Sequence, residues 1–305
     1  MNDKTNVLLV GASTEIGRYV LKQLLARKDK FNITVFDVKK SRSQTLLEPP
    51  RDEISVVYGN IALPADTVEV VKGQDFVIHC GFLSPRTACK KYPLAEEVNA
   101  LGTRFLIENL EHYSPQAYLV MLSSIEVYGD RLTAPMLRTS DFLAPSIGNF
   151  SALTRIQAEK FVQDSSLEWT IFRPGIVMGT EMEEMDGEIF LMPLESHLEF
   201  VHAEDLAFAL VESYQHRPSL WNKIFNVGGG TTCRAVYSEF LSRLFSTIGW
   251  GEMDFPERTF ATYNRYGGYF SDGDVLEEIL HFRKYSIDDY FSELANAKTL
   301  AGKLA

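Results

Sequence analysis

Hydroxyl and carboxylate side chains follow one apolar segment of the chain at short spacing. The run 117–122 is apolar throughout and predicts a buried strand, and Ser123, Ser124 and Glu126 come directly after it. Because ligands of open α/β sheets bind at the carboxyl ends of the strands, these side chains are expected where chemistry would occur. A carboxylate held in a dry pocket can remove a proton as a general base, which makes Glu126 a candidate. The alternative is that Glu126 is an acid on the solvated surface.

A second group of candidates follows the first expected strand, residues 7–10. Gly11 and Gly17 belong to a turn that leads into a helix, and backbone amides at a helix N-terminus suit a pyrophosphate. Asp37 ends the second expected strand, where a carboxylate accepts hydrogen bonds from an adenosine ribose and disfavours a 2′-phosphate. These residues predict NAD rather than NADP. The plainer interpretation is a structural turn, with Asp37 as a solvated loop acid.

Short apolar segments alternate with helical patterns along the first 175 residues. Such alternation indicates βαβ units, and right-handed crossovers wind their strands into a sheet with both faces covered. The fold class that we expect is α/β, a doubly wound parallel Rossmann-type sheet with a small C-terminal substrate lobe. Strands are expected at 7–10, 32–38, 54–58, 76–80, 118–122 and 170–172, and helices at 64–72, 93–112 and 150–165.

The pattern changes after Gly175, where a second part of the chain is expected to begin. We expect residues 1–175 to form the Rossmann domain, with 199–228 returning to it. Residues 176–198 and 229–305 would then form the small lobe over the carboxyl edge of the sheet, where ligands of such folds bind.

The composition restricts the classes of partner. The chain has 305 residues, 45% of them hydrophobic, and a formal net charge of −11. That acidic balance argues against a nucleic-acid groove or an anionic membrane surface, and no apolar run reaches the roughly 18 residues that span a bilayer. Three scattered cysteines and the absence of metal-ligand spacing predict reduced thiols, no metal site and a cytoplasmic protein.

The Gly-rich turn and three later motifs resemble the extended short-chain dehydrogenase/reductases, in particular the NAD-dependent epimerase/dehydratase family. The family's TGxxGxxG pattern keeps its first and third glycines here, but Thr14 replaces the middle one and Glu15 follows it. Because Thr14 crowds a phosphate and Glu15 repels it, one alternative is that the cofactor site is lost. The matching motifs are Gly59-Asn60-Ile61, His79-Cys80-Gly81 and Asn99-Ala-Leu-Gly102-Thr103.

The resemblance implies a cofactor and a set of contacts to it. The cofactor is NAD, and NADP is less favoured. The residues at the matching positions are Gly11, Ser13, Thr14, Glu15, Ile16, Gly17, Asp37, Asn60, Ile61, Cys80, Gly81, Asn99, Arg155, Pro174 and Ile176.

The active-site motif of the family is changed in this chain. The family places a Tyr-x-x-x-Lys pair on the helix expected at 150–165, where the tyrosine transfers a proton and the lysine holds the nicotinamide ribose. Counting back from Glu159, these positions hold Ser151 and Arg155. A serine is a far weaker acid than a phenol, whose pKa is about 10, and an arginine stays protonated. Carbonyl reduction by this pair is therefore not expected, and an alignment shifted by one residue is no better.

Other catalytic positions of the family are kept. Ser124 matches the serine that orients the substrate oxygen, and Asn99 matches the asparagine that supports a relay water. The segment from Ser124 to Asp130 resembles the T-D-E-V-Y-G-D segment of nucleotide-sugar 4,6-dehydratases, with Glu126 as the base and Ile125 in place of the acid. The candidate catalytic set is Ser124, Glu126, Ser151, Arg155 and Asn99.

Two functions of different classes are compatible with these residues. The first is an NAD-binding member of the family that acts on a small molecule by altered chemistry, redox or non-redox. The short acidic segment between Gly179 and Phe200 would repel a diphosphate, which favours a small or uncharged substrate. The second is a non-catalytic dinucleotide-binding sensor or scaffold. We also expect a homodimer through the helices at 93–112 and 150–165, as in the family.

Overall fold

The computed structural model describes residues 4–39, 53–179 and 187–304, and the chain divides into two units. The first unit comprises Met1–Ser124, Gly148–Arg173 and Ala207–Phe225. The second comprises Ile125–Ile147, Pro174–Leu206 and Asn226–Ala305. This division differs from the expected one chiefly at residues 125–147, which the sequence assigned to the Rossmann domain. Most of the acidic segment expected near the substrate (180–186) lies outside the described residues.

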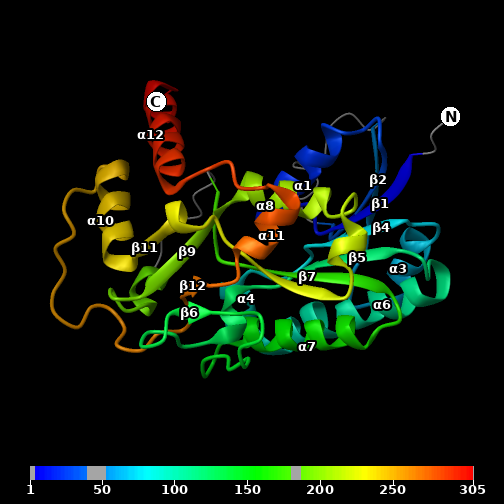
Figure 1. The fold of residues 1–305 in the computed structure, drawn as a ribbon, viewed down its shortest axis with the longest axis horizontal. Helices are drawn as coiled ribbons and strands as arrows, with labels where there is room; N and C mark the ends of the chain where they lie inside the picture. Colours follow the sequence, from blue (N-terminus) through cyan, green and yellow to red (C-terminus); the bar gives the residue numbers. More distant parts are fainter. Residues whose placement is uncertain (1–3, 40–52, 180–186, 305) are drawn as a thin grey trace. The chain divides into compact units, whose positions relative to one another are not determined.

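A seven-stranded sheet forms the centre of the first unit (Figure 1). Its strand order is β10-β7-β5-β4-β1-β2-β3, and the pairings from β7 to β3 are parallel. The order reverses between β1 and β4, which makes their carboxyl ends the switch point at which such folds bind ligands. The strands are β1 (Thr5–Val10), β2 (Phe31–Asp37), β3 (Ile54–Tyr58), β4 (Phe76–His79), β5 (Tyr118–Leu122), β7 (Glu168–Pro174) and β10 (Lys223–Val227).

Helices cover both faces of this sheet (Figure 1). On one face α3, α6 and α7 pack side by side, and on the other α1 lies beside the end of α8, where Arg27 pairs with Glu212 at 3.5 Å. Apolar side chains of β1, β4 and β5, among them Leu8, Val77 and Leu119, fill the layer beneath α6 and α7. The helices are α1 (Glu15–Leu25), α3 (Pro64–Val71), α4 (Pro85–Lys90), α5 (Tyr92–Ala95), η1 (Glu96–Leu101), α6 (Gly102–Tyr113), α7 (Phe150–Asp164), α8 (Ala203–Glu212) and α9 (Arg217–Leu220).

The second unit has its own core. The ring of Phe240 lies 4.5 Å from Phe200 and 5.4 Å from Phe291, which joins α10 and α12 to β9. Its strands are β6 (Met136–Leu137), β8 (Ile176–Met178), β9 (His197–His202), β11 (Arg234–Val236) and β12 (Tyr269–Phe270). Its helices are η2 (Ile125–Tyr128), η3 (Gly187–Leu191), η4 (Thr231–Cys233), α10 (Tyr237–Ile248), α11 (Asp274–Leu280) and α12 (Ile287–Leu304).

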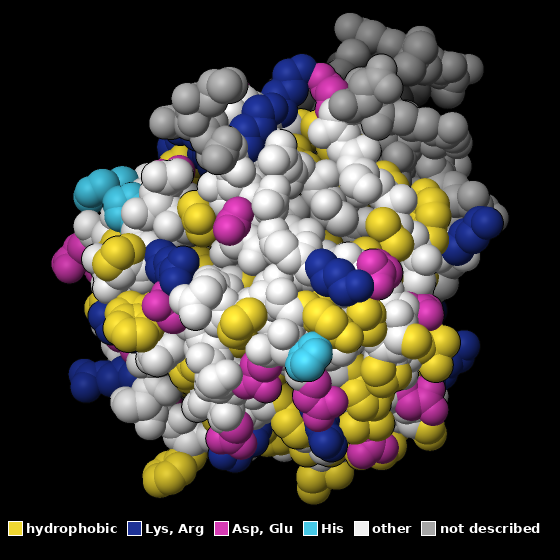
Figure 2. Space-filling model, turned by 90° about the vertical axis from the view of Figure 1, so that its right-hand side faces the viewer, with side chains coloured by type: hydrophobic (Ala, Val, Ile, Leu, Met, Phe, Trp, Pro, Cys, Tyr) yellow, Lys and Arg dark blue, Asp and Glu magenta, His cyan; other side chains and the backbone are white. Residues whose placement is uncertain are grey.

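The distribution of charge, the hydropathy of the helices and the grouping of metal-ligating side chains bear on the possible partners of the chain. On the face shown in Figure 2, the described acidic and basic side chains are interspersed with hydrophobic ones. Within the described ranges, no helix has the length and hydropathy that crossing a membrane requires. The same residues contain no cluster of three His, Cys, Asp or Glu side chains that could hold a metal ion.

Candidate functional site

The turn after β1 packs against the turn after β4, backbone to backbone. Gly11 has φ +83°, and a Cβ at this position would lie 2.4 Å from the Cα of Gly81. Gly17 is equally crowded, because its Cβ would lie 2.1 Å from the carbonyl oxygen of Gly11. Only glycine allows these approaches. The two glycines that the sequence predicts in the cofactor site therefore allow the turn after β1 to lie against the turn after β4, at the switch point of the sheet.

Thr14 begins α1 in place of the family's middle glycine. Its hydroxyl accepts a hydrogen bond from the Gly17 amide at 3.1 Å and donates to the Gly11 carbonyl at 2.7 Å. Thr14 is thus an N-cap, which stabilises the start of the helix. It also occupies the Gly17 amide, which would otherwise be able to donate a hydrogen bond to a phosphate. The amide of Ile16, in the first turn, has no acceptor within the helix. Glu15 is exposed. The turn therefore still fits a pyrophosphate, with fewer donors than a three-glycine turn offers.

Asp37 ends β2 and is 5% exposed, so it is not a solvated loop acid. Its carboxylate accepts hydrogen bonds from the Ser13 amide at 2.7 Å, the Ser13 hydroxyl at 2.9 Å and the Val38 amide at 2.7 Å. The side chain is therefore fixed against the Gly-rich turn, at the place where the sequence predicts ribose binding.

The residues expected beside the adenine lie after β3. Asn60 is exposed, and its amide donates to Asp66 at 2.8 Å. Ile61 is buried against Gly102, where an added Cβ would lie 2.7 Å from an Ile61 methyl. Gly102 thus allows α6 to contact the loop that follows β3.

The helix expected at 93–112 is interrupted by a π-helical turn, η1, which carries Asn99. The Asn99 side chain accepts from the Leu83 amide at 2.9 Å and donates to the Thr154 hydroxyl at 3.0 Å. Its carbonyl accepts from the Thr103 hydroxyl at 2.6 Å. Such turns are frequent at functional sites. Here the turn lets Asn99 join the loop after β4 to α7, and its role with a relay water stays a prediction.

His79 and Cys80 end β4 and are both buried. Because the Thr103 hydroxyl donates to Asn99, Nε2 of His79 donates to Thr103 at 2.9 Å, and Nδ1 accepts from the Gly81 amide at 3.3 Å. Burial, assisted by the charge of Arg155, lowers the pKa of His79 to about 3. Burial raises the pKa of Cys80 to about 12. The histidine is a neutral support for the Gly81 turn, and the thiol is unreactive.

Arg155 occupies the position of the family's lysine but binds main-chain oxygens. Its Nη1 donates to the Leu122 carbonyl at 2.9 Å and to the Ser123 carbonyl at 3.3 Å. Its guanidinium lies 4.5 Å from the centre of the Phe82 ring, which stacks in turn on His79. Arg155 thus ties the end of β5 to the loop that follows β4.

Ser151, at the position of the family's tyrosine, is completely buried. Its hydroxyl makes no hydrogen bond to any group that the structure describes. No phenol therefore projects from this turn of α7, and the serine is covered by its neighbours.

A buried network that the sequence did not predict lies one turn further along α7. Glu159 is fully buried and pairs with Arg173 at 2.6 Å, and it accepts from the Ser123 hydroxyl at 2.5 Å. The only sign of this network in the sequence is a glutamate among apolar positions of the helix. It holds α7 to the ends of β5 and β7.

The remaining candidates divide between the two units. Ser124 is half-buried and ends the first segment of the first unit. Glu126, in η2 of the second unit, is 4% exposed, which excludes the alternative of a solvated surface acid. Pro174 and Ile176, expected to contact the cofactor, also belong to the second unit.

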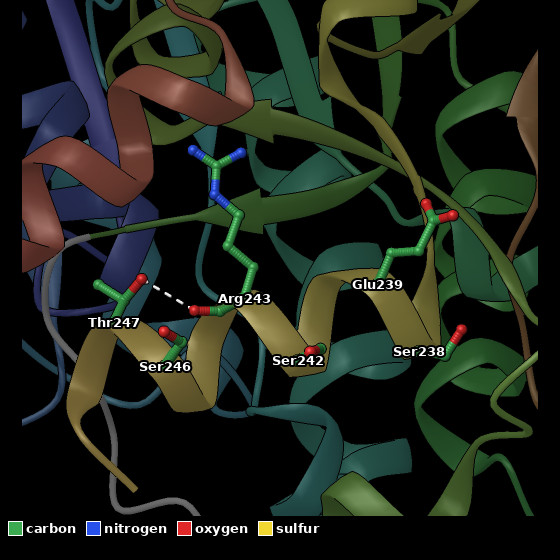
Figure 3. A pocket seen from close by; sticks show the side chains of 6 residues that line it. All are labelled: Ser238, Glu239, Ser242, Arg243, Ser246 and Thr247. Atoms are coloured by element: carbon green, nitrogen blue, oxygen red, sulfur yellow. Dashed lines mark hydrogen bonds between the residues drawn. The ribbon is translucent and has the colours of Figure 1, made fainter. Parts of the chain in front are cut away.

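A hollow on the outer face of α10 contains none of the predicted residues (Figure 3). All of its side chains come from one helix, and two of them already have partners. Arg243 lies 4.2 Å from the Phe291 ring, and Thr247 donates to the Arg243 carbonyl at 2.8 Å. The hollow is therefore a polar helix face rather than a substrate site. It is lined by Ser238, Glu239, Ser242, Arg243, Ser246 and Thr247.

Comparisons with known proteins agree with this architecture. A family model described as NAD(P)H-binding matches residues 11–217. An uncharacterized chloroplast protein of Arabidopsis thaliana is 23% identical over 203 residues, which cover 66% of this chain and 68% of that protein.

Two solved structures share the fold over nearly their whole length. UDP-glucuronic acid 4-epimerase from Bacillus cereus, in complex with UDP-glucuronic acid and NAD, aligns with a TM-score of 0.80 and 15% identity, over 97% of this chain and 100% of that chain. The dTDP-glucose 4,6-dehydratase DesIV from Streptomyces venezuelae, with NAD bound, gives a TM-score of 0.79 and 18% identity, over 98% of each chain. The expected Rossmann-type fold of the epimerases and dehydratases is confirmed.

Proposed function

Because the chain belongs to the NAD(P)H-binding family, we propose that its first unit binds NAD(H) across the carboxyl ends of β1, β2 and β4. The observation that carries this proposal is the position of Asp37. Its carboxylate is fixed at the end of β2 against the Gly-rich turn by Ser13. A carboxylate there accepts a ribose hydroxyl and repels a 2′-phosphate, so NAD is favoured over NADP.

The other residues of the site have matching chemistry. The turn from Gly11 to Gly17 and the Ile16 amide would receive the pyrophosphate at the start of α1. Ile61 would pack against the adenine, and Asn60 would lie at its edge. When bound, the dinucleotide supplies a group that accepts or donates hydride. The epimerase and dehydratase with the same fold contain NAD, which supports this choice.

We propose that the substrate is a small molecule and that α7 supplies no acid for it. Ser151 is buried and lacks the acidity of a phenol. Arg155 is engaged by two carbonyls at the end of β5. The groups left for proton transfer and orientation are Glu126, as a general base, and Ser124, as a hydrogen-bond donor to the substrate oxygen. The reaction is then redox with a substitute acid, or non-redox.

A specific observation favours a second function, binding of the dinucleotide without catalysis. Three of the five catalytic candidates, Asn99, Ser151 and Arg155, are at most 8% exposed within the first unit. Asn99 and Arg155 are hydrogen-bonded to neighbouring main-chain or side-chain groups. A protein whose old catalytic helix has become structural would act as a sensor of NAD or as a scaffold.

Titration of the purified protein with NAD, NADH, NADP and NADPH tests the proposal. We expect the two non-phosphorylated forms to bind more tightly. The bound protein is then assayed with a panel of alcohols and carbonyl compounds, in parallel with Ser124→Ala. Turnover that Ser124→Ala abolishes supports the enzyme, and binding without turnover supports the sensor or scaffold. Failure of all four dinucleotides to bind would contradict both functions.

We propose further that the protein is a cytoplasmic homodimer that pairs through α6 and α7. The three cysteines are free thiols, which agrees with a reducing compartment. Leu153 is exposed, and Phe105, Ile156 and Phe161 are only partly buried on these helices. Light scattering after gel filtration measures the mass, and introduction of a charge by Leu153→Glu should convert a dimer to a monomer.

A further inference from the structure

Ser13 holds the ribose-binding carboxylate in place with two hydrogen bonds. The Ser13 amide donates to Oδ2 of Asp37 at 2.7 Å, and the Ser13 hydroxyl donates to Oδ1 at 2.9 Å. The Val38 amide also donates to Oδ1, at 2.7 Å. Three donors, two of them from one residue of the Gly-rich turn, therefore surround this carboxylate.

The main chain of Asp37 is fixed as firmly as its side chain. Its carbonyl accepts from the Gly59 amide at 2.9 Å, and the residue pairs with Tyr58 in the parallel ladder of β2 and β3. The Gly11 amide donates to the Phe36 carbonyl at 2.9 Å, which fixes the turn to the same strand end. Rotation of the carboxylate would break hydrogen bonds to charged oxygen, each of which contributes more than a neutral one.

The geometry limits how many further donors Asp37 can accept. A carboxylate offers about four lone-pair positions, two on each oxygen. Oδ1 already accepts two hydrogen bonds and Oδ2 accepts one. With the donors that the described residues supply, one position remains, on Oδ2, whereas the adenosine ribose of NAD presents two hydroxyls.

Two cations near the turn would favour the opposite cofactor. Nη1 of Arg18 lies 3.4 Å from the Ser13 carbonyl, and Lys39 is exposed two residues after Asp37. Either could attract a 2′-phosphate if the carboxylate could turn away from it. The hydrogen bonds from Ser13 prevent that movement. Ser13 therefore determines whether repulsion of a 2′-phosphate by Asp37 outweighs its attraction by the two cations.

We propose that Ser13 is a specificity-determining residue. It leaves Asp37 a single open acceptor position, so that the protein recognises only one hydroxyl of the adenosine ribose, and it keeps the carboxylate where it rejects a 2′-phosphate. This inference rests on the proposed binding of NAD(H) in the first unit.

The test compares three adenosine forms of ADP-ribose, namely the parent, the 2′-deoxy analogue and the 3′-deoxy analogue. Their affinities are measured by isothermal titration for the wild type, Ser13→Ala and Ser13→Thr. For the wild type we expect one analogue to bind about tenfold more weakly than ADP-ribose and the other to match it within about threefold. Ser13→Ala opens a second acceptor position, so both analogues should then bind more weakly than ADP-ribose. Ser13→Thr keeps the hydroxyl and should restore the wild-type pattern.

A second readout is the preference between cofactors. Ser13→Ala should reduce the NAD over NADP preference by about tenfold, because its carboxylate can turn away from the 2′-phosphate. Thermal unfolding confirms that each variant is folded. Equal dependence of the wild type on both hydroxyls, or on neither, would overturn the inference while leaving dinucleotide binding intact. Failure of the wild type to bind ADP-ribose at all would instead overturn the proposed function.

Discussion

The two halves of the first unit treat their polar residues differently. Around β1 and β2, the Gly-rich turn offers hydrogen-bond donors and Asp37 offers acceptors at a strand end. Thr14 occupies one of these donors, and Ser13 occupies part of the Asp37 carboxylate. Around β5 and α7, the corresponding polar residues are bound to the main chain or to one another: Arg155 donates to carbonyls and Glu159 pairs with Arg173. This difference agrees with the proposal that the first unit binds a dinucleotide while the polar residues of α7 serve the core.

The largest loss in the free energy of unfolding should come from a substitution in the Gly-rich turn after β1. In Gly11→Ala, the new Cβ would meet the Gly81 backbone at 2.4 Å, which cannot move aside as a side chain can. We expect a loss of roughly 4 kcal/mol or more in the free energy of unfolding, and loss of NAD binding. The control is Gly73→Ala, which has φ +67° and no atom within 4 Å of the new Cβ. It should cost only about 1–2 kcal/mol for the left-handed backbone. Urea unfolding measures both, and equal losses would contradict the close contact of the two turns.

The structural role of α7 is tested by Glu159→Gln. Removal of this carboxylate breaks the buried ion pair between Glu159 and Arg173, which typically costs about 3 kcal/mol or more. The matched control on the same helix is Asp164→Asn, whose partner Lys160 is 69% exposed, and it should cost about 0.5 kcal/mol or less. Both variants, where folded, should still bind NAD. A free energy of unfolding that is the same in Glu159→Gln and the wild type would contradict the assignment of this region to the core.

His79 predicts a pH dependence of stability. Its pKa is lowered from 6.5 to about 3, so between these values the unfolded chain binds a proton that the folded chain does not. Stability should therefore fall as the pH falls from 6.5 towards 3, by about 1.4 kcal/mol per pH unit from this residue alone. His79→Gln retains a donor to Thr103 and should remove that part of the slope.

The control for this experiment is His112→Gln, because His112 is exposed at the end of α6. Unfolding by urea is followed at pH values of roughly 7, 6 and 5, which lie on either side of the unperturbed pKa of histidine. A slope that is the same in wild type and His79→Gln would show that His79 is not a neutral buried group.

The smallest effect is expected at Arg155, and it distinguishes a residue that binds the main chain from one that binds the cofactor. Arg155→Lys restores the family's residue but loses the planar group that binds the ends of β5 and stacks on Phe82. We expect a loss of about 1–2 kcal/mol in the free energy of unfolding, and NAD affinity within about threefold of wild type. Unchanged stability combined with much tighter NAD binding would mean that position 155 acts on the cofactor rather than on the core.

The sequence predicted the fold better than it predicted the contacts of the candidate residues. Alternating strands and helices, and Asp37 at a strand end, depend on local patterns that a sequence displays. The hydrogen bonds from Ser13 to Asp37 and the ion pair of Glu159 with Arg173 depend on side-chain orientation, which residue spacing does not indicate. The grouping of residues 125–147 with the second unit depends on partners that lie far along the chain, because β6 pairs with β12 and Tyr128 donates to Asn226 at 2.7 Å.

Isothermal titration of NAD and NADP into the wild type and Asp37→Asn tests the central claim most directly. We predict that the wild type binds NAD at least about tenfold more tightly than NADP, and that Asp37→Asn, which lacks the charge but keeps the size, narrows this difference. Absence of binding to either dinucleotide, or tighter binding of NADP by the wild type, would contradict the account.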